Sequence, residues 1–300
     1  MPDNRLTRLQ SRLICLSAYL VAAAGAYISG RIFNHGSPLW TAGAADLAAT
    51  VVVFIFSVAL DNSSLYDPYW SVAPVPILVY WIAVSGGLTS RQVVVLALVA
   101  IWAVRLTMNW LRRWRGLADE DWRYADYRRF KAAYWPVSFL GFHLFPTVIV
   151  FLGCMALFPA FLPTGRLPGV LDLLAVLVTL TAIAIEATAD RQLRRFILSR
   201  NDPGEVLNTG LWALSRHPNY FGEVLFWWGL WLFGLAANPS WWWTIAGPVA
   251  VTGLFLGVSI PMMDRRLLSR HPGYAQMTRG RSAFLPLPVS RLRDAGRRAL

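Results

Sequence analysis

The chain has 300 residues, of which 56% are hydrophobic and only 15% are charged, and its formal net charge is +12. A soluble domain carries about 25% charged residues, so this composition, with 15 Trp and a mean hydropathy of +0.45, excludes an ordinary soluble protein. The high net charge invites a nucleic-acid partner, but the position of the basic residues argues against one.

Apolar runs follow one another along the whole chain, and most approach the roughly 17–25 residues that cross a bilayer as a helix. They occupy residues 14–32, 43–61, 74–88, 91–110, 138–162, 168–189, 221–238 and 241–263. The run 74–88 is short, begins with prolines and is compatible with a re-entrant segment. The first run also resembles a secretory signal, but no soluble domain follows it. We therefore expect an all-α polytopic membrane bundle of seven or eight transmembrane helices.

The basic residues are distributed asymmetrically between the predicted loops. With the N-terminus inside, eight crossings leave only Arg31, Arg91 and Arg166 in outer loops, out of 28 Lys and Arg. This is the positive-inside pattern, and it predicts an integral membrane protein with both termini cytoplasmic. We treat 1–44 as a basic segment with the first helix and 45–300 as one membrane-embedded domain. The two cysteines lie in apolar runs and suggest neither a disulfide nor a metal site.

Four polar segments fall on the predicted cytosolic side: 61–74, 112–136, 190–223 and the tail from about Asp264. Ionisable groups also stand inside apolar runs, among them Arg105, with Asn109 one turn on, and Glu186, with Asp190 one turn on. Such groups tend to face partners or ligands, although a single arginine near a helix end can also extend its head to water. The four histidines show no metal-ligand spacing, so we expect no metal.

The segment 190–223 mixes arginines with Asn and Asp and leads into SRHPNYFGE at 215–223. Forked arginine donors suit phosphates, so a nucleotide-like ligand is one interpretation and a plain cytosolic basic loop is the other. No dinucleotide-binding glycine motif or phosphate-binding loop is present.

In YDPYW at 66–70, Asp67 stands among aromatics, where a carboxyl group can hold its proton and donate a hydrogen bond. A structural turn with interfacial aromatics is the alternative.

These residues carry a family resemblance. GLWALSRHPNYFGEVLFWWGLWLF resembles the signature of the steroid 5-alpha reductase-like membrane reductases, and DPYWSVAPV, RLTMNWLRRWRG, EDWRY, EATADRQLRRF and YAQMTRGRSAFLPLP resemble its bacterial branch. The resemblance covers the chain from about residue 45. It implies NADPH-dependent reduction of a carbon–carbon double bond in a 3-oxo-delta-4 steroid or similar lipid enone, in a cavity open to the cytosol. The host membrane would be a bacterial inner membrane.

Carried onto this sequence, the resemblance places Asp67 at the substrate ketone. The tyrosine that the family uses as its partner falls near Trp102 here, and we expect Tyr69 to take its place. The residues expected to contact the cofactor are Arg105, Asn109, Arg113, Arg123, Tyr124, Asp190, Arg200, Asn201, His217, Asn219, Tyr220, Glu223 and Arg281. The family's usual Glu is Asp here, Tyr66 replaces a Gln, and VSIPMMDRRL replaces a histidine-rich stretch. These departures leave the substrate and the details of cofactor binding open.

Two other interpretations remain. Membrane isoprenylcysteine and phospholipid methyltransferases share an RHPxY-type motif and use S-adenosylmethionine there, but many have a second acidic pair after the last helix, where this chain has only Asp264. A non-enzymatic lipid-binding or transport protein fits the helix count but does not explain the polar groups on one face. The expected partners are a lipid-like enone and membrane lipids, with no nucleic acid.

Overall fold

The computed structural model describes residues 6–34, 36–163, 165–202 and 204–287. The predicted cytoplasmic ends, 1–5 and 288–300, fall outside this described part. Within it, seven helical segments are long and apolar enough to span a membrane. The chain is thus a polytopic helical membrane protein, as predicted, and it divides into two compact units, Met1–Gly165 and Arg166–Leu300.

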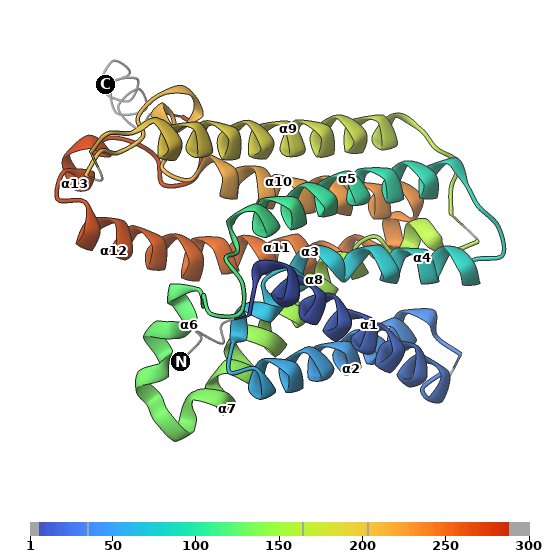
Figure 1. The fold of residues 1–300 in the computed structure, drawn as a ribbon. Coiled ribbons are helices and arrows are strands. Elements are labelled where there is room, and N and C mark those ends of the chain that lie inside the picture. Colours follow the sequence, from blue (N-terminus) through green and yellow to red (C-terminus); the bar gives the residue numbers. More distant parts are fainter. Residues whose placement is uncertain (1–5, 35, 164, 203, 288–300) are drawn as a thin grey trace, which may run out of the picture. The chain divides into compact units, whose positions relative to one another are not determined.

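The first unit is built from five successive helical segments. The long helices α1 (Arg8–Ile32) and α2 (Pro38–Ala59) lie side by side (Figure 1). A turn of η1 (Ser63–Tyr66) and α3 (Tyr69–Val72) leads into α4 (Pro74–Val84), and α5 (Ser90–Arg113) follows. The fifth segment joins α6 (Trp122–Tyr127), η2 (Arg128–Ala133), α7 (Tyr134–Ser138), η3 (Phe139–Leu144), α8 (Phe145–Met155) and η4 (Phe158–Phe161).

The predicted single helix at 138–162 is interrupted. It opens with a π-helical turn, η3, before α8 begins, and π-turns inside helices frequently mark functional sites. Here the turn carries His143, which is fully buried and bonds the Ser138 carbonyl at 3.0 Å and Ser57 Oγ at 3.2 Å. Buried polar groups need such partners, so the turn fits a histidine into an otherwise apolar span.

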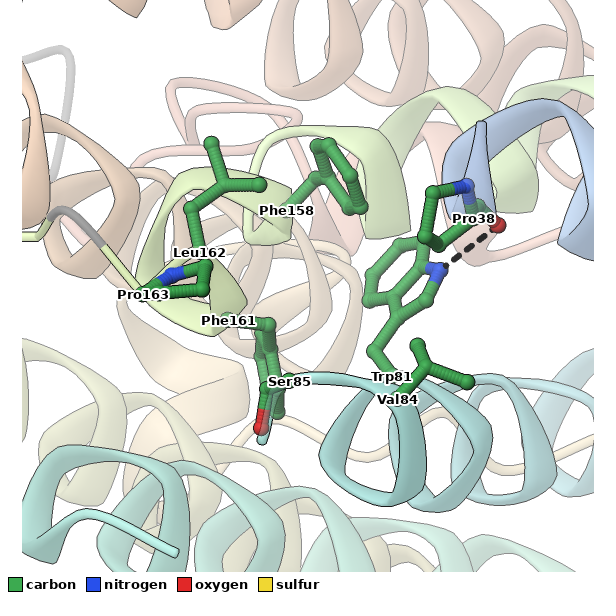
Figure 2. A pocket seen from close by; sticks show the side chains of 8 residues that line it. All are labelled: Pro38, Trp81, Val84, Ser85, Phe158, Phe161, Leu162 and Pro163. Atoms are coloured by element: carbon green, nitrogen blue, oxygen red, sulfur yellow. Dashed lines mark hydrogen bonds between the residues drawn. The ribbon is translucent and has the colours of Figure 1, made fainter. Parts of the chain in front are cut away.

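Helix α4 is short, with 11 residues, yet it reaches the end of the unit where α2 begins. Trp81 Nε1 donates to the Pro38 carbonyl at 3.2 Å (Figure 2). Around this contact lies a small apolar cavity of about 50 Å³, lined also by Phe158, Phe161 and Pro163. Helix α4 is apolar but is shorter than the segments that could span a membrane, and its last turns pack beside the start of α2.

The second unit has three long passes. Its helices are α9 (Val170–Ser199) and α10 (Pro218–Ala237), preceded by η5 (Gly210–Ala213), and a third segment of η6 (Pro239–Ile245), α11 (Ala246–Leu254), η7 (Phe255–Ser259) and α12 (Ile260–Arg270), followed by α13 (Tyr274–Met277). Helices α9 and α10 lie against each other along most of their length (Figure 1).

The contact between α9 and α10 depends on glycines. Gly222 of α10 lies so close to α9 that an added Cβ would stand 2.7 Å from Glu186 Cβ and 2.9 Å from the Ala182 carbonyl oxygen. At Gly229 an added Cβ would meet Thr179 Oγ1 at 2.3 Å. Small residues allow close backbone approach between membrane helices, so these two positions set the separation of α9 and α10.

Candidate functional site

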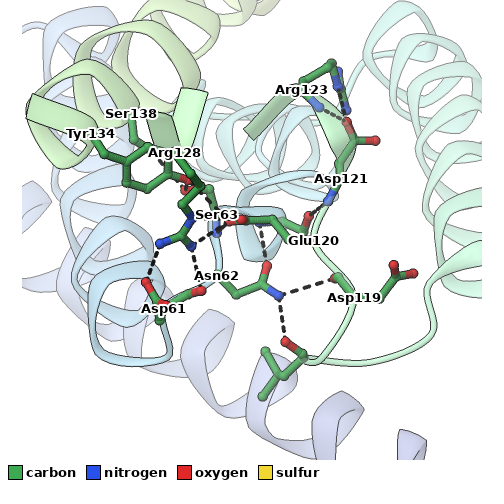
Figure 3. A network of polar contacts seen from close by, with 12 residues as sticks. Asp61, Asn62, Ser63, Asp119, Glu120, Asp121, Arg123, Arg128, Tyr134 and Ser138 are labelled. Carbon is green, nitrogen blue, oxygen red and sulfur yellow. Dashed lines mark hydrogen bonds and ion pairs between the residues drawn. The ribbon is translucent and has the colours of Figure 1, made fainter. Parts of the chain in front are cut away.

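The turn that carries Asp67 is fastened at its start by Asn62. The Asn62 carboxamide accepts a bond from Ser64 N at 2.8 Å, which begins η1. Its amide group donates to the carbonyls of Leu117 at 2.8 Å and Asp119 at 3.3 Å (Figure 3). One buried side chain thus joins the end of α2 to the loop before α6.

Glu120 strengthens the same junction (Figure 3). Its Oε1 accepts Ser63 N at 2.8 Å, and its two oxygens accept Arg128 Nη2 and Nε at 2.9 Å each. The Tyr134 hydroxyl donates to Oε1 at 3.2 Å. Arg128 also pairs with Asp61. Because charge-assisted bonds of this kind are stronger than neutral ones, the loop before α6 is held firmly beside η1.

This junction brings two residues of α6 to Asp67. The Tyr124 hydroxyl donates to Asp67 Oδ1 at 2.6 Å, and Arg123 Nη2 lies 3.3 Å from the same oxygen. The Asp67 side chain is 14% exposed. Its burial raises the pKa of Asp67 to about 6, against the opposing pull of Arg123, while Asp121 adds to the rise and the bond from Tyr124 reduces it. At this pKa, about half of the Asp67 side chains carry a proton at pH 6 and about a tenth at pH 7.

The two tyrosines beside Asp67 point elsewhere. The Tyr66 hydroxyl is 2.7 Å from Thr147 Oγ1 on α8, and the Tyr69 hydroxyl is 2.6 Å from Asp46 Oδ1 on α2. Their rings are stacked with centroids 5.1 Å apart. Tyr124 therefore bonds Asp67 where Tyr69 was expected to, and Tyr69 anchors the turn to α2.

We expect replacement of Glu120 by Ala to lower the free energy of unfolding by about 2 kcal/mol, because Ser63 N loses its acceptor and Arg128 keeps only its bonds to Asp61. Thermal unfolding in detergent measures the effect. Asp119→Ala is the matched control, since Asp119 contributes only its carbonyl to the junction. Equal losses in the two variants would contradict the role assigned to the Glu120 carboxylate.

In the second unit, polar side chains gather where α10 begins. His217 is the N-cap of α10 and is 2% exposed. Its Nε2 lies 2.9 Å from Asp264 Oδ1 on α12, and the Tyr274 hydroxyl donates to the same oxygen at 2.7 Å. Because an ionised carboxylate only accepts, Nε2 carries the imidazole proton. Burial, and then the bond to Asp264, raise the pKa of Tyr274 above its usual value.

Arg216 adds a positive charge to this cluster. Its Nη2 is 3.2 Å from Asp264 Oδ2, while its buried Nε has no partner among the described residues. The ring of Tyr220 is stacked on that of His217, with centroids 5.2 Å apart and planes inclined by 8°. One turn further on, the buried Glu223 accepts Trp227 Nε1 at 2.9 Å.

A C-terminal segment fixes the approach to α10. Arg216 N donates to the Ser282 carbonyl at 3.0 Å, and Ser215 Oγ donates to the Phe284 carbonyl at 2.9 Å. Arg281 Nη1 donates to the Trp212 carbonyl at 3.0 Å. Arg281 therefore lies beside the segment that leads into His217, and backbone carbonyls of the C-terminal segment bond Ser215 and Arg216.

The other predicted residues are distributed over both units. In the first unit, Arg105 and Asn109 are half-buried on α5 and Arg113 is exposed at its end. In the second, Asp190 is half-buried near the end of α9, Arg200 is its C-cap, Asn201 is exposed beyond it, and Asn219 is half-buried in the first turn of α10. The described contacts thus form two clusters, Asp67 with Arg123 and Tyr124, and His217 with Tyr220 and Arg216.

The sequence does not reveal the contacts of three acidic residues. Asp46 stands alone in an apolar run, which is itself a signal, but its contact with Tyr69 is not evident from spacing. Glu120 belongs to EDWRY, but the motif does not show that it bonds Ser63 and Arg128. The contact of Asp264 with His217 joins residues too far apart in the sequence for spacing to indicate it.

Comparison with known proteins gives a family but no activity. The family model described as "Protein of unknown function (DUF1295)" matches residues 53–280. An uncharacterized protein of Schizosaccharomyces pombe, C594.04c, is 28% identical over 251 residues, covering 74% of this chain and 72% of its own length. No solved structure matches. Because the family model covers most of the sequence, this chain belongs to the DUF1295 family.

Proposed function

We propose that this chain is an NADPH-dependent reductase of the carbon–carbon double bond of a lipid enone, with 3-oxo-delta-4 steroids as the first substrate class to test. The observation that carries the proposal is the Asp67 carboxyl, with its pKa raised to about 6 and Tyr124 bonded to it at 2.6 Å. A carboxyl group with a pKa of about 6 binds a proton in part of the molecules near this pH, and in that form it can donate to a carbonyl oxygen. Such a donor stabilises the negative charge that develops there during reduction.

In this proposal each residue near Asp67 has a defined part. The protonated Asp67 donates to the substrate carbonyl, while the Tyr124 hydroxyl bonds Oδ1 and fixes the carboxyl plane. Arg123, which also pairs with Asp121 at 2.7 Å, favours the ionised form. The balance between burial and Arg123 sets the pH at which Asp67 can donate.

The second unit offers groups that suit a phosphate-bearing nucleotide. Arg216 has a buried Nε without a partner among the described residues, and Arg281 lies on the same motif. The stacked rings of His217 and Tyr220 provide a flat aromatic surface. NADPH, when bound, would supply the hydride. On the same proposal, the membrane is a bacterial inner membrane with the basic loops and both termini in the cytoplasm.

One observation favours the second candidate, a methyltransferase that uses S-adenosylmethionine. Asp264 stands near the end of the last long helical segment and lies 2.9 Å from His217 of the RHP motif, so it supplies one acid of the pair that this interpretation expects. It does not account for the protonatable Asp67 or for Tyr124. We therefore place the reductase first.

The two candidates predict different ligand effects on thermal unfolding of the detergent-purified protein. At about 100 times its dissociation constant a ligand stabilises by roughly 2.7 kcal/mol, which raises Tm by about 5 °C. We expect NADPH to give this shift, and S-adenosylmethionine to give none.

Two arginine variants supply the control for this measurement. Arg216→Ala should reduce the NADPH-induced shift, whereas Arg265→Ala, an exposed arginine next to Asp264, should not. A shift with S-adenosylmethionine alone would replace the reductase by the methyltransferase. Equal NADPH shifts in both arginine variants would remove Arg216 from the cofactor site.

A further inference from the structure

Asp46 is a buried acid that neither candidate activity uses. It is 5% exposed and stands in the middle of α2, so that Asp46 and Ala59 at the helix end are about 20 Å apart. The Tyr69 hydroxyl lies 2.6 Å from its Oδ1 and 3.0 Å from its backbone carbonyl oxygen. Its Oδ2 is buried and has no hydrogen-bond partner among the described residues.

The hydrogen bonds at this contact favour a neutral Asp46. The Tyr69 hydroxyl carries one hydrogen but lies within bonding distance of two Asp46 oxygens, and it is also hydrogen-bonded to Thr50. If Asp46 carries a proton on Oδ1, it donates to the Tyr69 oxygen, and the Tyr69 hydrogen goes to the backbone carbonyl. Both contacts are then complete hydrogen bonds. If Asp46 is ionised, a single hydrogen is divided between two acceptors.

The titratable groups around Asp46 also favour its neutral form. The titratable groups that face Asp46 are Tyr69 of α3, Tyr66 of η1 and Cys154 of α8. None of these can become positively charged, and no Lys, Arg or His is paired with Asp46 in the described residues. An ionised carboxylate with a bare Oδ2 would be a buried charge without a counter-ion, which is among the most costly arrangements in a membrane. A neutral acid leaves only one carbonyl oxygen unbonded.

We infer that Asp46 is a proton-binding site, held as a neutral carboxylic acid in the interior of the first unit, and that it positions the turn that carries Asp67. Tyr69 is two residues from Asp67, and its bonds to Asp46 attach α3 to α2. Tyr66 attaches the other side of the turn to Thr147 on α8 at 2.7 Å. The inference does not depend on the reaction proposed above.

Infrared difference spectroscopy tests the protonation state directly. Wild-type protein minus Asp46→Asn at pH 8 should show a C=O stretching band of a protonated carboxylic acid. The band should move to lower frequency in deuterated buffer and persist from pH 6 to pH 9. In Tyr69→Phe it should move to higher frequency, because the bond from the acid is lost. Asp67→Asn should leave it unchanged. A spectrum without this band would overturn the inference.

Substitution tests the positioning role independently. Asparagine keeps one oxygen acceptor and one donor toward Tyr69, so Asp46→Asn should unfold within about 3 °C of wild type, with the same Tm dependence on pH between 6 and 9. Asp46→Ala removes both groups and should unfold at a clearly lower temperature. If Asp46→Asn loses as much as Asp46→Ala, or fails to fold, the acid is ionised and the inference is wrong. Failure of the reductase assay would not affect either result.

Discussion

Asp67→Asn is expected to reduce kcat/KM for enone reduction by about 10²–10³-fold, the effect of removing one donor to a developing oxyanion. The asparagine keeps an oxygen for Tyr124 but cannot present an acidic hydrogen. In the wild type, kcat/KM should rise as the pH falls toward 6, because the protonated carboxyl is the donor. The variant should show a flat profile over this range. Equal rates in both proteins would remove Asp67 from the reaction.

Asp67→Asn should lower activity but raise stability near neutral pH. The pKa of Asp67 is raised from 3.8 to about 6 by burial, so between these values the folded chain binds a proton that the unfolded chain releases. The wild type therefore loses stability as pH rises through this window, on the order of 3 kcal/mol in total, and the loss persists above pH 6. Asp67→Asn has no such loss.

The matched measurement is Tm of both proteins from pH 4.5 to pH 8. The difference between Asp67→Asn and wild type should grow in favour of the variant up to about pH 6 and then stay constant. A difference that grows in the opposite direction would mean that Arg123 and Tyr124 outweigh burial and that the folded-state pKa lies below the usual value. A variant that has lost activity but unfolds at or above the wild-type Tm at pH 7.5 separates function from folding.

Gly222→Ala is expected to have the largest effect on stability, a loss of about 3 kcal/mol or more. The added Cβ would lie 2.9 Å from both the Ala182 carbonyl oxygen and Glu186 N. These are backbone atoms of α9, so no side-chain rotation can relieve the contact and the two helices must separate. Gly229→Ala should act in the same way, against Thr179.

Gly253→Ala is the control for both substitutions. Gly253 lies in α11, and a Cβ built there meets nothing within 4 Å. Alanine should therefore be neutral there or stabilise by up to about 1 kcal/mol, since glycine is a poor helix residue. Thermal unfolding in the same detergent measures all three variants. Losses of equal size at Gly253 and Gly222 would show that helix composition, and not close packing, determines the effect.

Composition and hydropathy were enough to predict the helical membrane architecture, because long apolar runs have few other stable forms. The run at 138–162 was predicted as one helix, and the π-turn at His143 was not, since it depends on bonds to Ser57 and Ser138 from distant parts of the chain. Local sequence also misassigned the partner of Asp67. Tyr69 is nearer along the chain, but Tyr124 is brought there by Glu120 and Asn62.

The short α4 has a consequence for where the turn that carries Asp67 lies. Together α3 and α4 extend for about 24 Å, less than the roughly 30 Å thickness of the hydrocarbon layer. Since Trp81 bonds Pro38, the first residue of α2, at one end, the turn at the other end lies beside α2 and not beyond its last residue, which agrees with the contact of Tyr69 with Asp46. The chain between Ala59 and Tyr69 therefore folds back along α2, and the turn that carries Asp67 is packed against a long apolar helix.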